Sequence, residues 1–166
     1  MKTITEVERQ SLANQYKILA KLYDDDSLLV YADILEYGYT GLYGEVLNTS
    51  EEVSFDICKE SDEILTMYRR IENAKAKLKP EEKEELDLSR IDFNGFDANN
   101  DLHYGYMTFQ VEKMNLWEEH KDNYLNSHDQ TSILKYRRLL EYQKELLANK
   151  KYELDKNDLI HMIEIV

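Results

Sequence analysis

Residues that shape turns and cross-links are scarce in this chain of 166 residues, which has one proline, five glycines and one cysteine. β-Sandwiches and barrels contain many tight turns, so this composition argues against them. The single Cys58 excludes an intramolecular disulfide and fits a reducing compartment, so we expect a cytoplasmic protein. No apolar run reaches the ~18 residues that a membrane-spanning helix needs. The charged start of the chain argues against a signal peptide.

Charge of one sign dominates the sequence, with 34 acidic and 21 basic side chains and a net charge of -13. Residues 80–129 contain 13 acidic and 4 basic side chains and so supply -9 of that charge. Such a field repels phosphate groups, and we therefore expect neither direct nucleic-acid binding nor attachment to an anionic membrane. The charge either keeps the protein soluble or attracts a basic protein partner.

Apolar residues recur at helical spacing through most of the chain, which predicts an all-α, multihelical fold with about 65% helix. We expect one all-helical domain over residues 1–166, with residues 1–48 as a candidate N-terminal helical subdomain. Residues 87–100 and 118–129 are predicted to be irregular because they are rich in turn formers and polar side chains. The predicted helices cover residues 5–23, 28–37, 41–47, 54–78, 80–86, 102–117, 133–147 and 155–166.

Local signals predict where several helices begin and end. Thr5 and Glu8 have the spacing of a capping box. Gly38 can adopt the left-handed conformation that ends a helix. Ser54, or Thr49 before it, is expected to cap the long central helix.

Two apolar stripes predict which helix faces are buried. The first helix is expected to bury Leu12, Tyr16, Leu19 and Tyr23. The helix after residue 101 is expected to bury the stripe formed by Leu102, Tyr106, Phe109, Leu116 and Trp117. A strand that contains Tyr104, Tyr106 and Phe109 is the alternative for this segment.

The motifs of metal sites are incomplete. A calcium loop that started at Asp97 would have ligands at Asn99 and Asp101, but Leu102 and Thr108 occupy the positions that require Gly and Glu. The turn with capping Asn and Asp side chains is the better interpretation.

The remaining candidate groups also lack the patterns of catalytic or metal centres. No two histidines have the spacing of a helical metal pair, so each is expected at the surface or at the edge of the core. Cys58 has no visible base to activate it, and phosphate-loop and nucleophile-elbow motifs are absent. We expect no metal and no cofactor. The four histidines are His103, His120, His128 and His161.

Several short motifs occur along the chain. They are SLANQYKIL at 11–19, E-x-G-Y at 36–39, Cys58, Met67-Tyr68, RIDFNGFDAN at 90–99, G-Y-x-x-F at 105–109 and ELDKNDLIHMI at 153–163. Together they resemble the bacterial YfbU-like family, over most of the sequence but not over residues 110–130. The resemblance implies an all-helical cytoplasmic protein that contains an up-and-down helical bundle, with no settled activity and no established catalytic residue.

The motifs also supply the candidate site residues. In the 90–97 segment, Phe93 and Phe96 can hold the loop to the core while Gly95 permits a tight turn. Asp97 is then expected to cap the next helix or to pair with Arg90. A structural role is the favoured interpretation, and a partner surface is the alternative. The full candidate set is Asn14, Tyr16, Arg90, Phe93, Gly95, Phe96, Asp97 and Tyr106.

Three functions remain open from the sequence. A non-enzymatic interaction or regulatory protein is favoured. The alternatives are an acidic protein that blocks the basic nucleic-acid-binding surface of a partner, and an enzyme with an unrecognised site. The 13 tyrosines and the cluster Met114, Leu116 and Trp117 favour a homo-oligomer, since surplus aromatic and apolar residues often form contacts.

Overall fold

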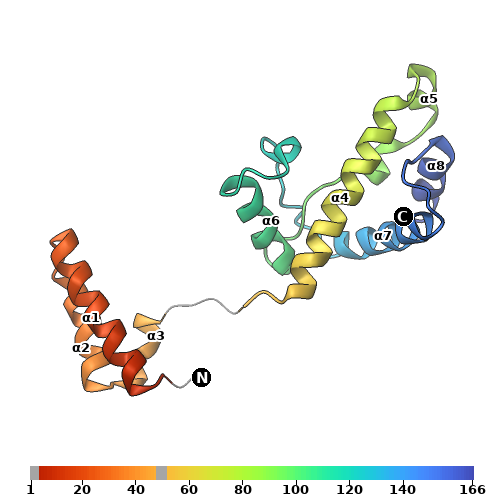
Figure 1. Cartoon of the computed structure of the whole chain (residues 1–166). Coiled ribbons are helices and arrows are strands. Elements are labelled where there is room, and N and C mark those ends of the chain that lie inside the picture. Colours follow the sequence, from red (N-terminus) through yellow and green to blue (C-terminus); the bar gives the residue numbers. More distant parts are fainter. Residues whose placement is uncertain (1–3, 48–51) are drawn as a thin grey trace. The chain divides into compact units, whose positions relative to one another are not determined.

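The computed structural model describes residues 4–47 and 52–166, and it divides the chain into two compact units (Figure 1). The first unit is Met1–Glu52 and the second is Val53–Val166. Of the described residues, 69% are helical and none forms a strand, so the predicted all-α multihelical fold is confirmed. No helix of the described ranges is both long enough and apolar enough to cross a membrane.

The N-terminal unit is a helical hairpin that is followed in the sequence by a short helical segment. Its elements are α1 (Glu6–Tyr23), α2 (Ser27–Tyr37), the 3-10 helix η1 (Thr40–Leu42) and α3 (Tyr43–Val46). The capping box of Thr5 and Glu8 is present at the start of α1. Gly38 ends α2 with φ at +69°, as predicted.

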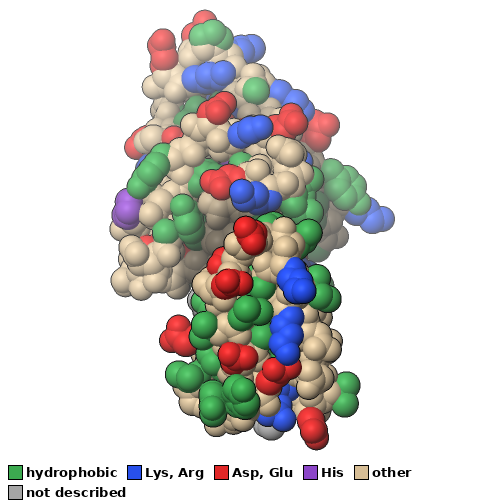
Figure 2. All heavy atoms as spheres, turned by 90° about the vertical axis from the view of Figure 1, so that its left-hand side faces the viewer, with side chains coloured by type: hydrophobic (Ala, Val, Ile, Leu, Met, Phe, Trp, Pro, Cys, Tyr) green, Lys and Arg blue, Asp and Glu red, His purple; other side chains and the backbone are tan. Residues whose placement is uncertain are grey.

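The core of the N-terminal unit is small. Ala13, Ile34, Leu35 and Val46 form its buried cluster. The prediction that Tyr23 completes the buried stripe of α1 is wrong, because its side chain is 69% exposed. Small residues, Ala13 and Ala20, are the buried side chains of α1. Figure 2 shows hydrophobic side chains on the surface of the protein, between basic and acidic ones.

The C-terminal unit is organised around its longest helix. This helix, α4, contacts α6, α7 and α8. Ser54 caps α4, as predicted, and Thr49 lies outside the described residues. The elements are α4 (Phe55–Lys77), α5 (Pro80–Glu85), η2 (Leu88–Ile91), α6 (Leu102–Glu112), η3 (Glu118–His120), α7 (Ser132–Ala148) and α8 (Lys156–Glu164).

The core of this unit includes rings as well as aliphatic side chains. Tyr68 and Tyr136 are both fully buried, and their ring centroids lie 5.2 Å apart. Phe96 is also fully buried and packs edge-on against Tyr136. Because the segment before α6 supplies Phe96, this irregular part of the chain is fixed to the helices by core packing.

Helix α6 differs from its prediction in length and in orientation. It ends at Glu112 rather than at residue 117, and Asn115 and Trp117 adopt left-handed backbone conformations. Its buried side chains are His103, Met107, Gln110 and Val111, whereas Leu102 and Phe109 of the predicted stripe are more than half exposed.

Carboxylates on α4 explain this orientation. His103 Nε2 lies 2.8 Å from Glu60, and Gln110 Nε2 donates to Asp62 over 2.8 Å. The polar residues of α6 can therefore be buried because α4 supplies their hydrogen-bond partners.

Candidate functional site

The segment 92–97 is attached to the loop around Leu125 by backbone hydrogen bonds. The Phe96 N–H donates to the Leu125 carbonyl over 3.1 Å, and the Ser127 N–H donates to the Phe96 carbonyl over 3.0 Å. Gly95 has φ at +81°, and a Cβ at this position would lie 1.7 Å from the Leu125 oxygen. Only glycine fits this close approach, which confirms the predicted tight turn.

Tyr136 anchors the same turn from α7. Its hydroxyl donates to the Gly95 carbonyl over 2.7 Å and accepts from the Asn94 N–H over 3.3 Å. Burial raises the pKa of Tyr136, so it stays protonated and can donate. Phe93 packs above it, with its ring 5.5 Å from Tyr136 and 4.9 Å from Tyr68.

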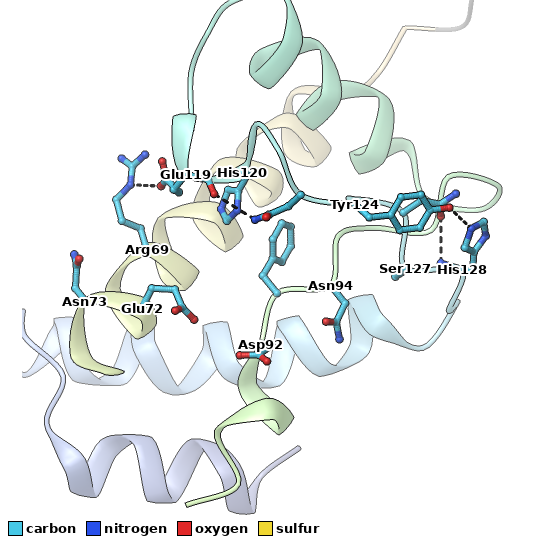
Figure 3. Close-up of a pocket in the computed structure, with 13 residues that line it drawn as sticks. Arg69, Glu72, Asn73, Asp92, Asn94, Glu119, His120, Tyr124, Ser127 and His128 are labelled. Atoms are coloured by element: carbon cyan, nitrogen blue, oxygen red, sulfur yellow. Dashed lines mark hydrogen bonds and ion pairs between the residues drawn. The ribbon is translucent and has the colours of Figure 1, made fainter. Parts of the chain in front are cut away.

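An open groove of about 1000 Å³ lies where this segment faces α4 and residues 119–128 (Figure 3). Figure 3 shows Arg69, Glu72 and Asn73 coming from α4, and His120 and Tyr124 from the opposite segment. The lining residues are Arg69, Glu72, Asn73, Asp92, Phe93, Asn94, Glu119, His120, Asn123, Tyr124, Asn126, Ser127 and His128.

The carboxylates of the groove are all ion-paired. Arg69 Nε lies 2.5 Å from Glu119, and the side-chain nitrogen of Lys75 lies 2.7 Å from Glu72 and 2.5 Å from Asp92. The hydrogen bond from Arg69 lowers the pKa of Glu119, so this carboxylate remains charged. The groove therefore presents little uncompensated charge to a ligand.

The amides of the groove have different partners. Asn126 accepts from the backbone N–H groups of Ala98 and His128, and so it holds the turn. The side-chain amides of Asn73 and Asn94 bond to no other described residue, and both residues are exposed. Each free amide offers two donors and an acceptor.

Two histidines are buried, which corrects the prediction that all four lie at the surface or at the edge of the core. His103 is 5% and His120 is 6% exposed. His120 lines the groove, and its Nε2 has no hydrogen-bond partner among the described residues. Burial lowers the pKa of His120, so the ring is neutral near pH 7.

The hydroxyl of Ser127 is not placed for nucleophilic catalysis. It lies 3.2 Å from the hydroxyl of Ser132 and 3.4 Å from the Asp129 carbonyl, not beside a histidine ring. His128 is instead bonded to the Tyr124 hydroxyl over 2.6 Å. Ser127 thus lacks, among the described residues, the adjacent base that nucleophilic catalysis needs.

Of the predicted site residues in the 90–97 segment, the groove exposes Phe93, while Gly95, Phe96 and Asp97 are buried. Asp97 does not cap α6, whose N-cap residue is Asp101, and among the described residues it forms no ion pair with Arg90. Its carboxylate instead accepts from the Asn99 N–H over 3.0 Å and from the Asn100 amide over 2.6 Å, which closes a turn. Arg90 donates to the Val166 carbonyl.

The other three predicted residues are not among those that line the groove. Asn14 is exposed on α1, where its side chain accepts from Gln10 over 3.2 Å. The Tyr16 hydroxyl donates to the Val46 carbonyl over 3.0 Å within the N-terminal unit. Tyr106 on α6 donates to Asp62 over 3.3 Å.

Sequence reasoning missed the side of the groove that residues 119–128 form. The sequence predicts only a polar loop for this stretch, although it contains several Asn and His residues together with Tyr and Ser. That composition is the feature of the sequence from which a binding surface could have been predicted. In the described ranges, no group of three or more His, Cys, Asp or Glu side chains is arranged to hold a metal ion.

Comparison with known proteins identifies relatives over nearly the whole chain. The model of the YfbU domain matches residues 1–164. UPF0304 protein MJECS11 from Methanocaldococcus jannaschii is 30% identical over 172 residues, which covers 96% of this chain and 98% of that protein.

Proposed function

The chain belongs to the YfbU family, and from its groove we propose that it is a non-enzymatic interaction protein that holds a polar segment of its partner there. The free amides of Asn73 and Asn94 beside the Phe93 ring carry this proposal. Amides can pair with the N–H and C=O groups of a peptide, and an aromatic ring can pack on its side chains. The lone Cys58 supports a cytoplasmic location.

Hydrogen bonding rather than net charge selects this partner segment. The groove carboxylates already have basic partners within the chain, so a cationic ligand would have to compete with Arg69 and Lys75. A neutral polar segment meets no such competition. This chemistry supports the interaction role over the two alternative functions.

The acidic residues of 80–129 offer less support for a protein that blocks a basic surface. Glu82 and Glu85 pair with Lys156, over 3.5 and 3.0 Å. With Asp92 and Glu119, four of the 13 acidic residues of this stretch therefore have basic partners within the chain. Exposed pairs of this kind are also strongly screened at physiological salt.

Affinity capture from the native cell extract tests the proposal. The bait is the full chain, and the test variant carries Asn73→Ala and Asn94→Ala, which remove two free amides and no internal hydrogen bond. Asn157→Ala on α8 is the matched control, since its residue is exposed and away from the groove. A partner bound by wild type and control but lost by the double variant supports the proposal; equal recovery from all three baits contradicts it.

The salt dependence of the association rate distinguishes binding in the groove from the alternative, an acidic protein that blocks a basic surface. For a partner held by hydrogen bonds in the groove, the association rate changes little with salt or when five acids become Gln or Asn. A rate that falls under both changes would instead favour the blocking protein, because electrostatic steering acts mainly on association. The five acids are Glu81, Glu82, Glu84, Glu85 and Asp87.

A further inference from the structure

Helix α6 is apolar on two faces, and the chain covers one of them. Met107 and Val111 are buried against the rest of the C-terminal unit. On the outer face, Leu102 is 56% and Phe109 is 57% exposed, with Gly105 between them at helical spacing. A helix that is apolar all round is normally buried all round. The outer face of α6 therefore lacks a cover among the described residues of its unit.

Gly105 is a second, independent sign of a missing neighbour. Glycine is less favourable than alanine inside a helix. Gly105 does not have the positive φ found at Gly38 and Gly95, and nothing lies within 4 Å of where its Cβ would be. Among the described residues of its own unit, nothing thus requires glycine here. A close approach by another backbone would require it.

The outer face is also the place where two copies can meet without repulsion. Charged residues make up 33% of the chain, yet none occurs from Leu102 to Val111. Two molecules with a net charge of -13 repel each other over most of their surfaces. An uncharged helix face avoids this repulsion, whereas it offers nothing to a strongly basic partner.

We infer that this face binds a second copy of the chain, with the two α6 helices antiparallel about a two-fold axis between Gly105 and Tyr106. In this arrangement Leu102 lies opposite Phe109 of the partner subunit, and the two Gly105 residues lie beside the axis. The large side chains of one helix face the space left by glycine on the other. The same patch serves both subunits, as a two-fold interface requires.

The size of the face sets the strength of the contact. Eleven helical residues are about 16 Å long. Exposed Met114 and Leu116, which follow α6, can extend the contact. A contact made by one short helix and these two side chains buries less than the ~800 Å² per partner of a standard interface. The dimer is therefore expected to have a dissociation constant in the micromolar range, on the order of 1–50 μM.

Sedimentation equilibrium of the full chain between 1 and 200 μM tests the inference. Wild type should pass from the 19.8 kDa monomer to twice that mass. Phe109→Glu and Gly105→Leu should weaken association at least tenfold. Phe55→Glu, which adds the same charge at a side chain that is 79% exposed on α4, should leave it unchanged. A monomeric wild type at 200 μM, or variants that associate as wild type does, would overturn the inference.

Two further measurements test whether the variants lose association because they misfold, and whether the two α6 helices are antiparallel. Gly105→Ala should raise the melting temperature of the monomer, measured at 1 μM, while it weakens the dimer, because alanine favours the helix but prevents close approach. Leu102→Lys and Phe109→Glu should each weaken association, and the double variant should restore part of it. If the double variant is no better than the worse single one, the antiparallel pairing is wrong.

Discussion

The two units of the chain hold their helices by different means. Among the described residues of the N-terminal unit, the buried cluster has four members and nine large apolar side chains are exposed. In the C-terminal unit 17 buried side chains form one cluster, and polar groups far apart in sequence are paired, as Glu60 is with His103 and Arg137. Local interactions therefore matter more for the first unit, and contacts distant in sequence matter more for the second.

This difference has a consequence for stability. A unit of about 50 residues buries a smaller fraction of its surface than a larger domain does and is marginal by itself. We therefore expect the C-terminal unit to unfold in a cooperative transition while the N-terminal unit opens more readily. Trp117, the single tryptophan, lies in the C-terminal unit and reports on its unfolding.

The largest expected effect is that of Phe96→Ala. The ring is fully buried among Phe93, His103 and Tyr136, so its loss should reduce the free energy of unfolding of the C-terminal unit by about 3–5 kcal/mol. The urea midpoint followed by Trp117 fluorescence measures this. An unchanged midpoint would mean that the ring is exposed and the segment free to bind a partner.

Leu35→Ala should act as strongly on the other unit. Leu35 is fully buried in the small N-terminal core, and its truncation typically costs about 2–5 kcal/mol. We expect α1 and α2 to lose protection from hydrogen exchange while the Trp117 midpoint stays unchanged. Leu29→Ala, at a partly exposed side chain of the same helix, is the control and should have a much smaller effect. A Trp117 midpoint that falls with Leu35→Ala would show that the units unfold together.

A smaller effect concerns Glu60, which joins α4 to α6 and α7. The hydrogen bond from Arg137 lowers the pKa of Glu60 to about 2, and His103 adds to this effect. Because the folded-state pKa lies below the unfolded value, the stabilisation is full above pH ~4.5 and is lost as the pH falls towards 2. Allowing for solvent screening, it amounts to about 1–2 kcal/mol at pH 7.

Glu60→Gln tests this contribution. The variant should have a lower urea midpoint than wild type at pH 7, and the difference should shrink as the pH falls from 4.5 to 2.5. Glu84→Gln, at an exposed glutamate on α5, is the control for lost charge. A difference that is the same at both ends of this pH range would mean that Glu60 acts through packing and not through its charge.

The smallest expected effects come from the helix caps, one in each unit. Thr5→Ala and Ser54→Ala each remove a side-chain acceptor at a helix start and should cost about 0.5–1 kcal/mol. Hydrogen exchange in α1 measures the first change, and the Trp117 midpoint measures the second. The comparison of units predicts that the Thr5 change alters exchange through all of α1, since little tertiary packing opposes fraying there. If the Thr5 and Ser54 changes each affected only the first turn of their helix, and to the same extent, the expected difference between the units would be wrong.

Local chemistry made parts of the fold predictable from the sequence. The capping box at Thr5, the cap at Ser54 and the left-handed Gly38 each depend on residues within four positions of one another. The burial of Phe96 and the turn at Gly95 were also predicted, because two aromatic residues around a glycine leave few other arrangements.

Tertiary structure decided what pattern alone could not. The sequence by itself determined the all-α class and most helix starts, since helical periodicity and caps are local. It could not determine which face of α6 is buried, because Glu60 and Asp62 on α4 satisfy His103 and Gln110 and so reverse the apolar preference. The groove depends in the same way on Leu125 meeting Phe96 across 29 positions of the chain. Such contacts between distant residues depend on how the helices pack, and the local sequence pattern therefore does not predict them.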